Sequence, residues 1–513
     1  MGGYCRAFSD ENERSMSRLW DEPLGSRGAL SARLARLGQA RLRRVRRLLR
    51  GPEHRRLRPR AGALLDALAS TLDSLPRASR VSILLGPDLR GFLAEAETWL
   101  EVGRLAAAIP RAGRGDPAGR RPALLFDRIA RTEHLATLVP RGRLDPGFPL
   151  RSLRFARGRL EAALDDLSAF VLGLRLAHPS PGPLDLVLRF REDAEQGRPR
   201  DRIDLGAFSA PAGPLGITAP MAAARREGTR LDAALRRGAL ALRIAGRKAA
   251  IVPAAGSRIT APDLEPEGGG GQGSSRRRGI RLVRRATIPG TSILLAPRVD
   301  SRPRRLRVTR QVPGLERRLA RALRLVRIAW PEAYREILLR TRMVVPVHEP
   351  GTVSWSLAAR PGISFIHVSG KSLVDLADDL LHENSHHRLH DMEEAARLLR
   401  PGADTEEVQA FDSPWRGTRR PLRGILHGAF TFLFRAGLFR RILRASRRHP
   451  GLLAADLGRG GPAFVRSELR REVKMIGRAL EDLKQASAEG LLAPAGVRLV
   501  RQMSIAWRDL RRG

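Results

Sequence analysis

The chain has 513 residues, of which 42% are hydrophobic, so it can bury a substantial core and form about two to four domains. Its single cysteine, Cys5, excludes an intramolecular disulfide and fits a reducing cytosol. Residues 1–20 lack the apolar segment of a signal peptide, and the longest apolar run, near residues 425–434, is too short to cross a bilayer. We therefore expect a cytoplasmic protein with no membrane segment.

The formal net charge of +41 suggests a polyanionic partner, but the composition offers another explanation. Only four of the 94 basic residues are lysines, and an arginine excess of this kind, with abundant Ala, Gly, Leu and Pro, is typical of a GC-rich coding sequence. Aromatic residues make up 4% of the chain, and no basic run alternates with them as base stacking requires. We do not expect dedicated nucleic-acid binding, and an acidic peptide fits the charge equally well.

Three regions follow one another along the chain. Residues 1–200 carry Leu, Ala and Arg at helical spacing and predict a mainly helical region. Residues 201–312 contain shorter runs, such as 239–244, that predict strands, and a flexible Gly/Ser loop is expected at 265–279. Residues 313–513 are expected to form the metal-binding catalytic domain. The sequence therefore predicts a predominantly α-helical α+β fold.

The C-terminal region has its own order of elements. A helix is expected from Pro313 to Leu339. Short β-like runs and two amphipathic helices are expected after it, at 343–347, 353–357, 364–368, 464–488 and 496–510.

An HExxH pattern occupies residues 382–386, between the β-like runs and the last helices. Two histidines four positions apart lie on one helical face, about one 5.4 Å turn apart, so both imidazoles can bind one metal ion. Glu383 would then lie beside the ion as base, ligand or orienting group. An apolar stripe precedes the pattern, so we expect an amphipathic helix with its acidic residues outward. Ser372 and Asp375 resemble a capping box at its start, and it is expected to reach Leu399.

Two histidines leave a metal ion short of protein ligands, and the sequence offers two further candidates. His427 follows a segment with a rigid turn and several arginines and enters an apolar helix. Glu406 lies twenty residues beyond His386, an offset similar to that of thermolysin-type zinc peptidases, but its surroundings are a solvent-like Thr-Glu-Glu run. His390 shares the helical face, yet we do not expect it to reach an ion held between His382 and His386.

The motifs around the HExxH helix together resemble a known family. They are Pro361–Phe365 before it, and Ser413–Arg416, Arg420–Gly424 and Leu426–Gly428 after it. The combination resembles the HExxH-type, 2-oxoglutarate-dependent peptide β-hydroxylases of gene clusters that make ribosomally synthesised, post-translationally modified peptides. The resemblance covers about residues 340–435. Residues 417–419 depart from it, because the family more often has acidic or Asp-Pro character there.

The resemblance implies an Fe(II) centre with His382, His386 and His427 as ligands, because three protein ligands leave positions open for O2 and a bidentate 2-oxo acid. Glu383 would orient a ligand or a water molecule, or would itself be the carboxylate ligand. The implied substrate is a precursor peptide that is hydroxylated at Cβ. An acidic leader segment on this peptide would match the positive charge of the chain.

The implied cofactor 2-oxoglutarate has a distal carboxylate, which a planar, permanently charged guanidinium binds well. The candidates near the motif are Arg416, Arg420 and Arg423. Trp415, in the same segment, is expected to pack in the core rather than to stack on the substrate.

Two other functions stay open at this point. A zinc metallopeptidase of the HExxH type would use Glu383 to activate a metal-bound water and would cleave its substrate without 2-oxoglutarate. A basic nucleic-acid-binding protein without catalysis would bind DNA or RNA in a salt-dependent manner and would not need His382.

Overall fold

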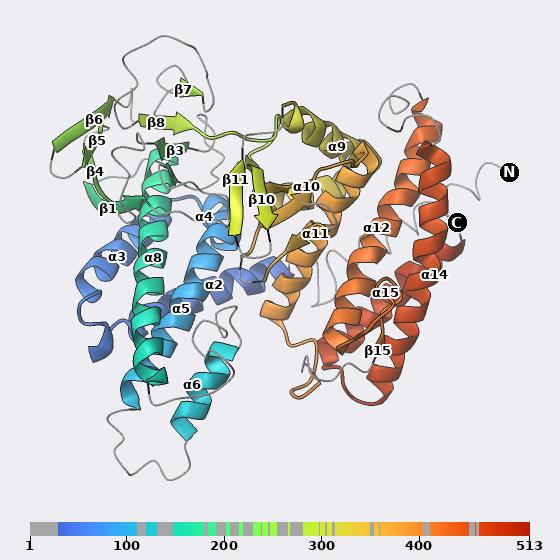
Figure 1. Ribbon diagram of the computed structural model, residues 1–513, viewed down its shortest axis with the longest axis horizontal. Coiled ribbons are helices and arrows are strands. Elements are labelled where there is room, and N and C mark those ends of the chain that lie inside the picture. The colour runs from blue at the N-terminus through green and yellow to red at the C-terminus, as the bar shows by residue number, and fades with distance from the viewer. Residues whose placement is uncertain are drawn as a thin grey trace. The chain divides into compact units, whose positions relative to one another are not determined.

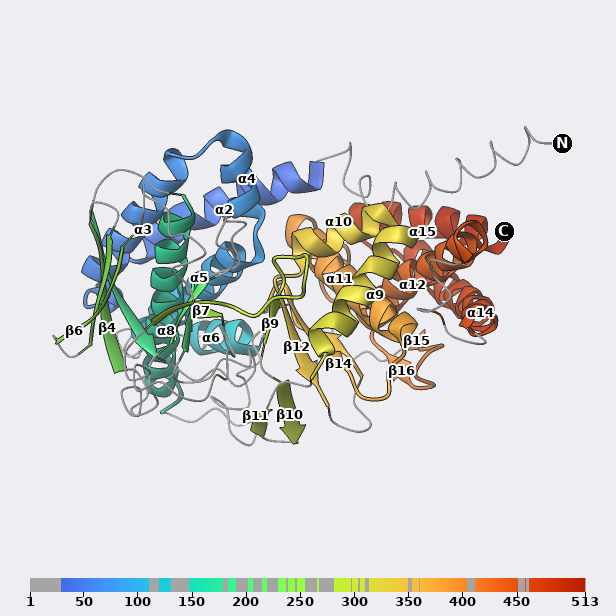
Figure 2. The ribbon, with the colours of Figure 1, turned by 90° about the horizontal axis from the view of Figure 1, so that it is seen from above.

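A computed structural model provides the fold (Figures 1 and 2). It describes residues 29–109, 120–130, 147–178, 183–190, 202–205, 215–218, 229–236, 239–244, 247–253, 265–266, 281–296, 298–302, 305–309, 313–348, 353–358, 360–403, 411–450, 457 and 461–512. Helices predominate and the sheets are small, which confirms the predominantly helical α+β fold. Among the described residues, no helix is both long enough and apolar enough for a bilayer-spanning segment.

The chain divides into two compact units. The C-terminal unit comprises residues 1–35, 288–358 and 362–513, and the N-terminal unit comprises residues 36–287 and 359–361. The N-terminal unit holds most of α2 (Ala29–Leu48), and η1 (Pro52–His54), α3 (Arg58–Asp73), α4 (Arg77–Leu85), α5 (Pro87–Ala108), α6 (Arg120–Ala130) and α8 (Phe148–Ala177). Its strands are β1 (Leu184–Phe190), β2 (Arg202–Asp204), β3 (Leu215–Thr218), β4 (Thr229–Arg236), β5 (Ala239–Ile244), β6 (Arg247–Pro253), β7 (Glu265–Pro266) and β8 (Arg281–Arg284).

Helices and strands of the N-terminal unit share one hydrophobic core. The sheet β1-β4-β5-β6 is antiparallel, and alternate β1 residues, including Leu188 and Phe190, are buried together with Leu167 of α8. The second sheet has the order β2-β3-β8-β7. The boundary expected at residue 200 therefore falls inside a single core. The expected loop at 265–279 begins with β7, and its residues from 267 on lie outside the described residues.

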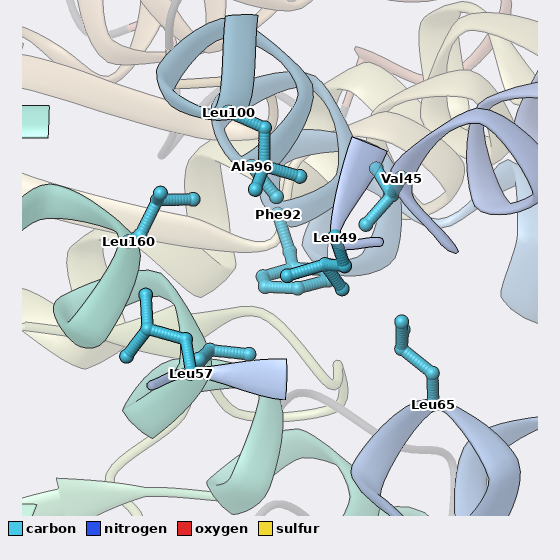
Figure 3. A pocket seen from close by; sticks show the side chains of 9 residues that line it. Val45, Leu49, Leu57, Leu65, Phe92, Ala96, Leu100 and Leu160 are labelled. Carbon is cyan, nitrogen blue, oxygen red and sulfur yellow. The ribbon is translucent and has the colours of Figure 1, made fainter. Parts of the chain in front are cut away.

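A small apolar cavity lies between the helices of the N-terminal unit (Figure 3). Every side chain that lines it is apolar, so we expect it to hold no ordered water. The lining residues are Val45, Leu49, Leu57, Leu65, Phe92, Ala96, Leu100, Leu160 and Leu164.

The C-terminal unit combines a mixed sheet with a group of long helices. Its sheet has the order β11-β10-β12-β14-β13, and β9 also pairs with β12. The strands are β9 (Leu294–Leu295), β10 (Arg298–Arg302), β11 (Arg305–Thr309), β12 (Met343–Val347), β13 (Trp355–Ser356) and β14 (Ile363–His367), with a separate hairpin of β15 (Phe411–Asp412) and β16 (Arg419–Arg420). The helices are α9 (Leu315–Ala329), α10 (Pro331–Arg340), α11 (Leu373–Ala395), α12 (Leu422–Arg448), α14 (Gly461–Ala488) and α15 (Pro494–Arg512).

The parallel pair β12 and β14 lies at the centre of this sheet. All five residues of β12 are buried, which explains its continuous apolar sequence. Strands β9 and β10 pair with β12, so residues from 288 onward belong to the C-terminal unit although the sequence placed them in the middle region. Helices α11 and α12 follow β14 in the chain, and Figure 1 shows them side by side.

Two helix boundaries differ from the expected ones. The helix expected over 313–339 is two helices, α9 and α10, because Pro331 starts a new helix after Trp330 leaves the helical conformation. Helix α11 ends at Ala395 rather than at Leu399, since Leu399 forms a β-bridge with Leu492. The two terminal helices are present as α14 and α15.

Candidate metal centre

The start of α11 is fixed by the predicted capping box. The Ser372 hydroxyl accepts a hydrogen bond from the Asp375 amide at 3.1 Å, and the Asp375 carboxylate accepts one from the Ser372 amide at 2.9 Å. The apolar stripe, including Leu376 and Leu380, is buried as expected. The expectation that the acidic residues face outward is wrong for Asp378, which is buried and forms an ion pair with Arg435 of α12 at 3.0 Å.

Helix α11 presents a row of histidines to α12. His382, His386 and His390 follow at one-turn intervals, with ring centroids 5.0 Å apart for the first pair and 6.2 Å for the second. His427 comes from the second turn of α12, and its ring centroid lies 5.5 Å from that of His386 and 5.3 Å from that of His390. Four imidazoles therefore gather between two helices.

His386 and His427, two of the ligands that the family resemblance implies, lie in direct contact. Nδ1 of His386 and Nδ1 of His427 are 3.3 Å apart, a distance that suits either an N–H···N hydrogen bond or shared coordination of one ion. Two histidine nitrogens bound to one ion, each about 2.0–2.1 Å from it, are roughly 3.3 Å apart in tetrahedral geometry and roughly 2.9 Å apart at adjacent octahedral positions. The pair therefore has the separation that a shared metal ion requires.

Burial favours the neutral form of His382 and His386. Burial lowers the pKa of His382 to about 3, with Arg435, Lys371 and Arg416 adding to the effect. Burial and the neighbouring histidines hold the pKa of His386 well below its ordinary value. Since neutral imidazole is the form that binds metals, the row is ready for coordination without losing protons.

His390 contributes a second sign of a ligand site. Burial, followed by the nearby His427, lowers its pKa to about 3. Its Nδ1 atom is buried and has no hydrogen-bond partner among the described residues. His390, Glu393 and His427 each offer one ligand atom, and these atoms lie within 4.8 Å of one another. The sequence argument set His390 aside, but among the described residues His390 forms a three-ligand group with Glu393 and His427, and the expected set of His382, His386 and His427 does not come together within the same distance.

Glu393 is the residue that the sequence argument missed. Its Oε1 lies 3.1 Å from Nε2 of His427, and Arg423 donates two hydrogen bonds to it, from Nε to Oε1 at 3.0 Å and from Nη2 to Oε2 at 2.8 Å. Burial alone would raise the pKa of Glu393, but the hydrogen bonds from His427 and Arg423 lower it to about 2. The sequence feature that could have identified Glu393 is its position seven residues after His386, on the same helical face.

Glu383 faces the sheet rather than the histidine row. It is 1% exposed and lies beside Ser356 of β13. Burial raises its pKa to about 8, and the nearby Ser356 hydroxyl opposes this shift. His387, one turn further on, is bound on the same side, with Nε2 3.1 Å from the Ser364 hydroxyl of β14. Burial therefore favours the protonated form of the Glu383 carboxyl group.

The three arginines proposed for 2-oxoglutarate lie in different surroundings. Arg416 is exposed on the turn between β15 and β16 and contributes to the lowered pKa of His382. Arg420 is half-buried, with its side chain over Gly424. Arg423 already binds a carboxylate, that of Glu393.

Trp415 contacts side chains of both α12 and α14. Its ring stacks on Phe432 with centroids 4.4 Å apart, and its Nε1 donates a hydrogen bond to Glu472 of α14 at 2.8 Å. The ring also covers Gly428, where a Cβ atom would lie 2.9 Å from it. Phe432 in turn contacts His382, with centroids 4.9 Å apart. Trp415 thus packs within the protein, as expected.

Glu406, the alternative third ligand, lies outside the described residues. Neither models of known protein families nor curated proteins match this chain. The family resemblance therefore depends on the motif residues of the sequence alone.

Proposed function

We propose that this protein is an Fe(II)- and 2-oxoglutarate-dependent hydroxylase that modifies Cβ positions of a ribosomally made precursor peptide. The observation that carries the proposal is the 3.3 Å approach of Nδ1 of His386 to Nδ1 of His427 across two helices. His382, one turn before His386, would complete a set of three ligands and leave coordination positions open. Fe(II) with 2-oxoglutarate and O2 supplies the oxidising chemistry that inserts oxygen into a C–H bond.

The surrounding residues would bind the organic reactants. Since Arg423 is engaged by Glu393, Arg416 and Arg420 are the arginines that would bind the distal carboxylate of 2-oxoglutarate. The position of Glu383 favours the hydroxylase over a zinc metallopeptidase, because a peptidase would need this carboxylate to face the metal. Glu383 is instead buried beside Ser356 of the sheet.

The net charge of +41 supports an acidic leader on the precursor peptide. Helix α14 presents four exposed basic residues at successive one-turn intervals: Arg466, Arg470, Lys474 and Arg478. Like charges at this spacing destabilise a helix by a few tenths of a kcal/mol per pair, so an acidic peptide on this face would relieve a repulsion.

Metal content and turnover test the proposal together. The chain loaded anaerobically with Fe(II) is given O2 and 2-oxoglutarate with a candidate acidic precursor peptide. We expect succinate, CO2 and a peptide heavier by one oxygen atom. His386→Ala and His427→Ala are each expected to lose the iron and the turnover, and His382→Ala likewise.

His390→Ala distinguishes the two possible ligand sets on this helical face, and the set with His382 predicts that this variant retains the iron. Loss of iron in His390→Ala with retention in His382→Ala would move the centre to the group of His390, Glu393 and His427. Cleavage of the peptide without 2-oxoglutarate would instead identify a peptidase and refute the hydroxylase.

A further inference from the structure

We infer that Glu393 is a positioning residue of the metal centre, which orients His427 for coordination through Nδ1, and that Arg423 holds Glu393 in place. The inference depends on the metal centre of the proposed function and adds two residues to it.

The first step concerns the proton on His427. A carboxylate can only accept hydrogen bonds, so the 3.1 Å contact between Nε2 and Glu393 Oε1 requires the hydrogen of neutral His427 to be on Nε2. The lone pair is then on Nδ1. This is the atom that lies 3.3 Å from Nδ1 of His386. Glu393 therefore selects the tautomer whose free nitrogen faces the neighbouring ligand.

The second step concerns what holds Glu393. Both of its oxygens accept hydrogen bonds from the Arg423 guanidinium, at 3.0 and 2.8 Å. A two-point contact of this kind fixes the plane of the carboxylate as well as its position. Arg423 and His427 are one turn apart on α12, so a single face of this helix supplies both partners of Glu393.

The third step separates positioning from direct coordination. Glu393 is near enough to His390 and His427 to belong to a ligand group itself. Its Oε1 atom, however, already accepts hydrogen bonds from both Arg423 and His427, so coordination through this oxygen would break one of these contacts. Carboxylate–histidine–metal arrangements, in which the carboxylate binds the far ring nitrogen, commonly tune metal affinity. The geometry matches that arrangement.

The test measures metal affinity rather than turnover. The metal-free full-length chain is titrated with Co²⁺, and binding and ligand geometry are followed by the visible absorption of the bound ion. We expect Glu393→Ala to weaken binding about 10- to 100-fold and to change the spectrum. Glu393→Gln should retain most of the affinity, because its amide oxygen still accepts the hydrogen bond from Nε2. Arg423→Ala should weaken binding less than Glu393→Ala.

Glu336→Ala provides the matched control. Glu336 is 20% exposed, against 18% for Glu393, and it also pairs with arginines, Arg340 and Arg388, beside α11. No hydrogen bond or ion pair joins it to a histidine among the described residues of the unit, so its removal should reduce stability and leave Co²⁺ affinity unchanged.

Each outcome has a separate meaning. If the unaltered chain does not bind Co²⁺, the proposed function fails and the inference fails with it. If the unaltered chain binds and Glu393→Ala binds equally well, the inference alone is overturned. Equal loss in Glu393→Gln and Glu393→Ala would make Glu393 a ligand and would also overturn the positioning role.

Discussion

At the scale of single residues, the contact between Gly428 and Trp415 has a measurable consequence. A Cβ at position 428 would lie 2.9 Å from the Trp415 ring, which Phe432 and Glu472 hold on its other sides. We expect Gly428→Ala to lower the free energy of unfolding by about 1–3 kcal/mol, because the overlap outweighs the better helix propensity of Ala. Urea denaturation measures this change.

Gly424, one turn earlier on α12, serves as the control for this variant. A Cβ there would meet only the flexible Arg420 side chain, at 3.3 Å, so Gly424→Ala should be neutral or stabilising. An equal loss of stability in both variants would contradict the role of the Trp415 contact.

The residue scale also shows which parts of the site a sequence can reveal. His382 and His386 follow from their spacing alone, and His390 and Glu393 could have been added, because i, i+4 and i+7 positions share a helical face. The partnership of Arg423 with Glu393 could not be predicted. Only the packing of α12 on α11 selects this arginine among so many in the chain.

At the scale of elements, Arg435 connects three helices. It lies on α12 and pairs with Asp378 of α11 at 3.0 Å and with Glu472 and Glu468 of α14 at 3.5 and 3.7 Å. Replacing it leaves buried carboxylates without their counter-charge. We expect Arg435→Leu to cost about 3–5 kcal/mol of unfolding free energy, measured by urea denaturation.

Arg471→Leu is the control, because Arg471 pairs with the same Glu468 and Glu472 but is 55% exposed. Solvent screens such a pair, so its loss should cost at most about 1 kcal/mol. A similar cost for both variants would show that the burial of Arg435 is not what matters.

Elements were predicted well where the pattern is local and poorly where it is not. The capping box of α11 and the two terminal helices follow from residue spacing. The inward position of Asp378 depends on Arg435, which is distant in sequence. The break at Pro331 is an exception, because proline is a local signal for the start of a new helix and the break could have been predicted.

At the scale of the whole molecule, the division into units was the least predictable feature. The composition changes near residue 200, yet Leu167 of α8 and Leu231 of β4 share a core across that change. A change of local pattern from helix to strand therefore does not mark the end of a domain, since helices and strands bury their apolar faces against each other.

Both units contain histidines that resist protonation, and this predicts how the protein responds to acid. Burial lowers the pKa of His54, whose Nε2 lies 3.1 Å from the Leu100 carbonyl, and the pKa of His382 falls to about 3. Below the ordinary value of about 6.5, the unfolded chain binds protons that the folded chain does not. Stability should therefore be unaffected by these groups above pH 6.5 and should fall as the pH drops below it.

Each such histidine can contribute a slope of at most about 1.4 kcal/mol per pH unit until its own folded-state pKa is reached. We expect the urea midpoint of the metal-free chain to fall between pH 6.5 and pH 4, and to fall less steeply in His54→Gln, which cannot titrate there. His178→Gln is the control, because His178 lies at the surface-facing end of α8 and is only half-buried. A midpoint that stays constant over this range, or an unchanged slope in His54→Gln, would mean that burial does not keep His54 neutral in the folded state.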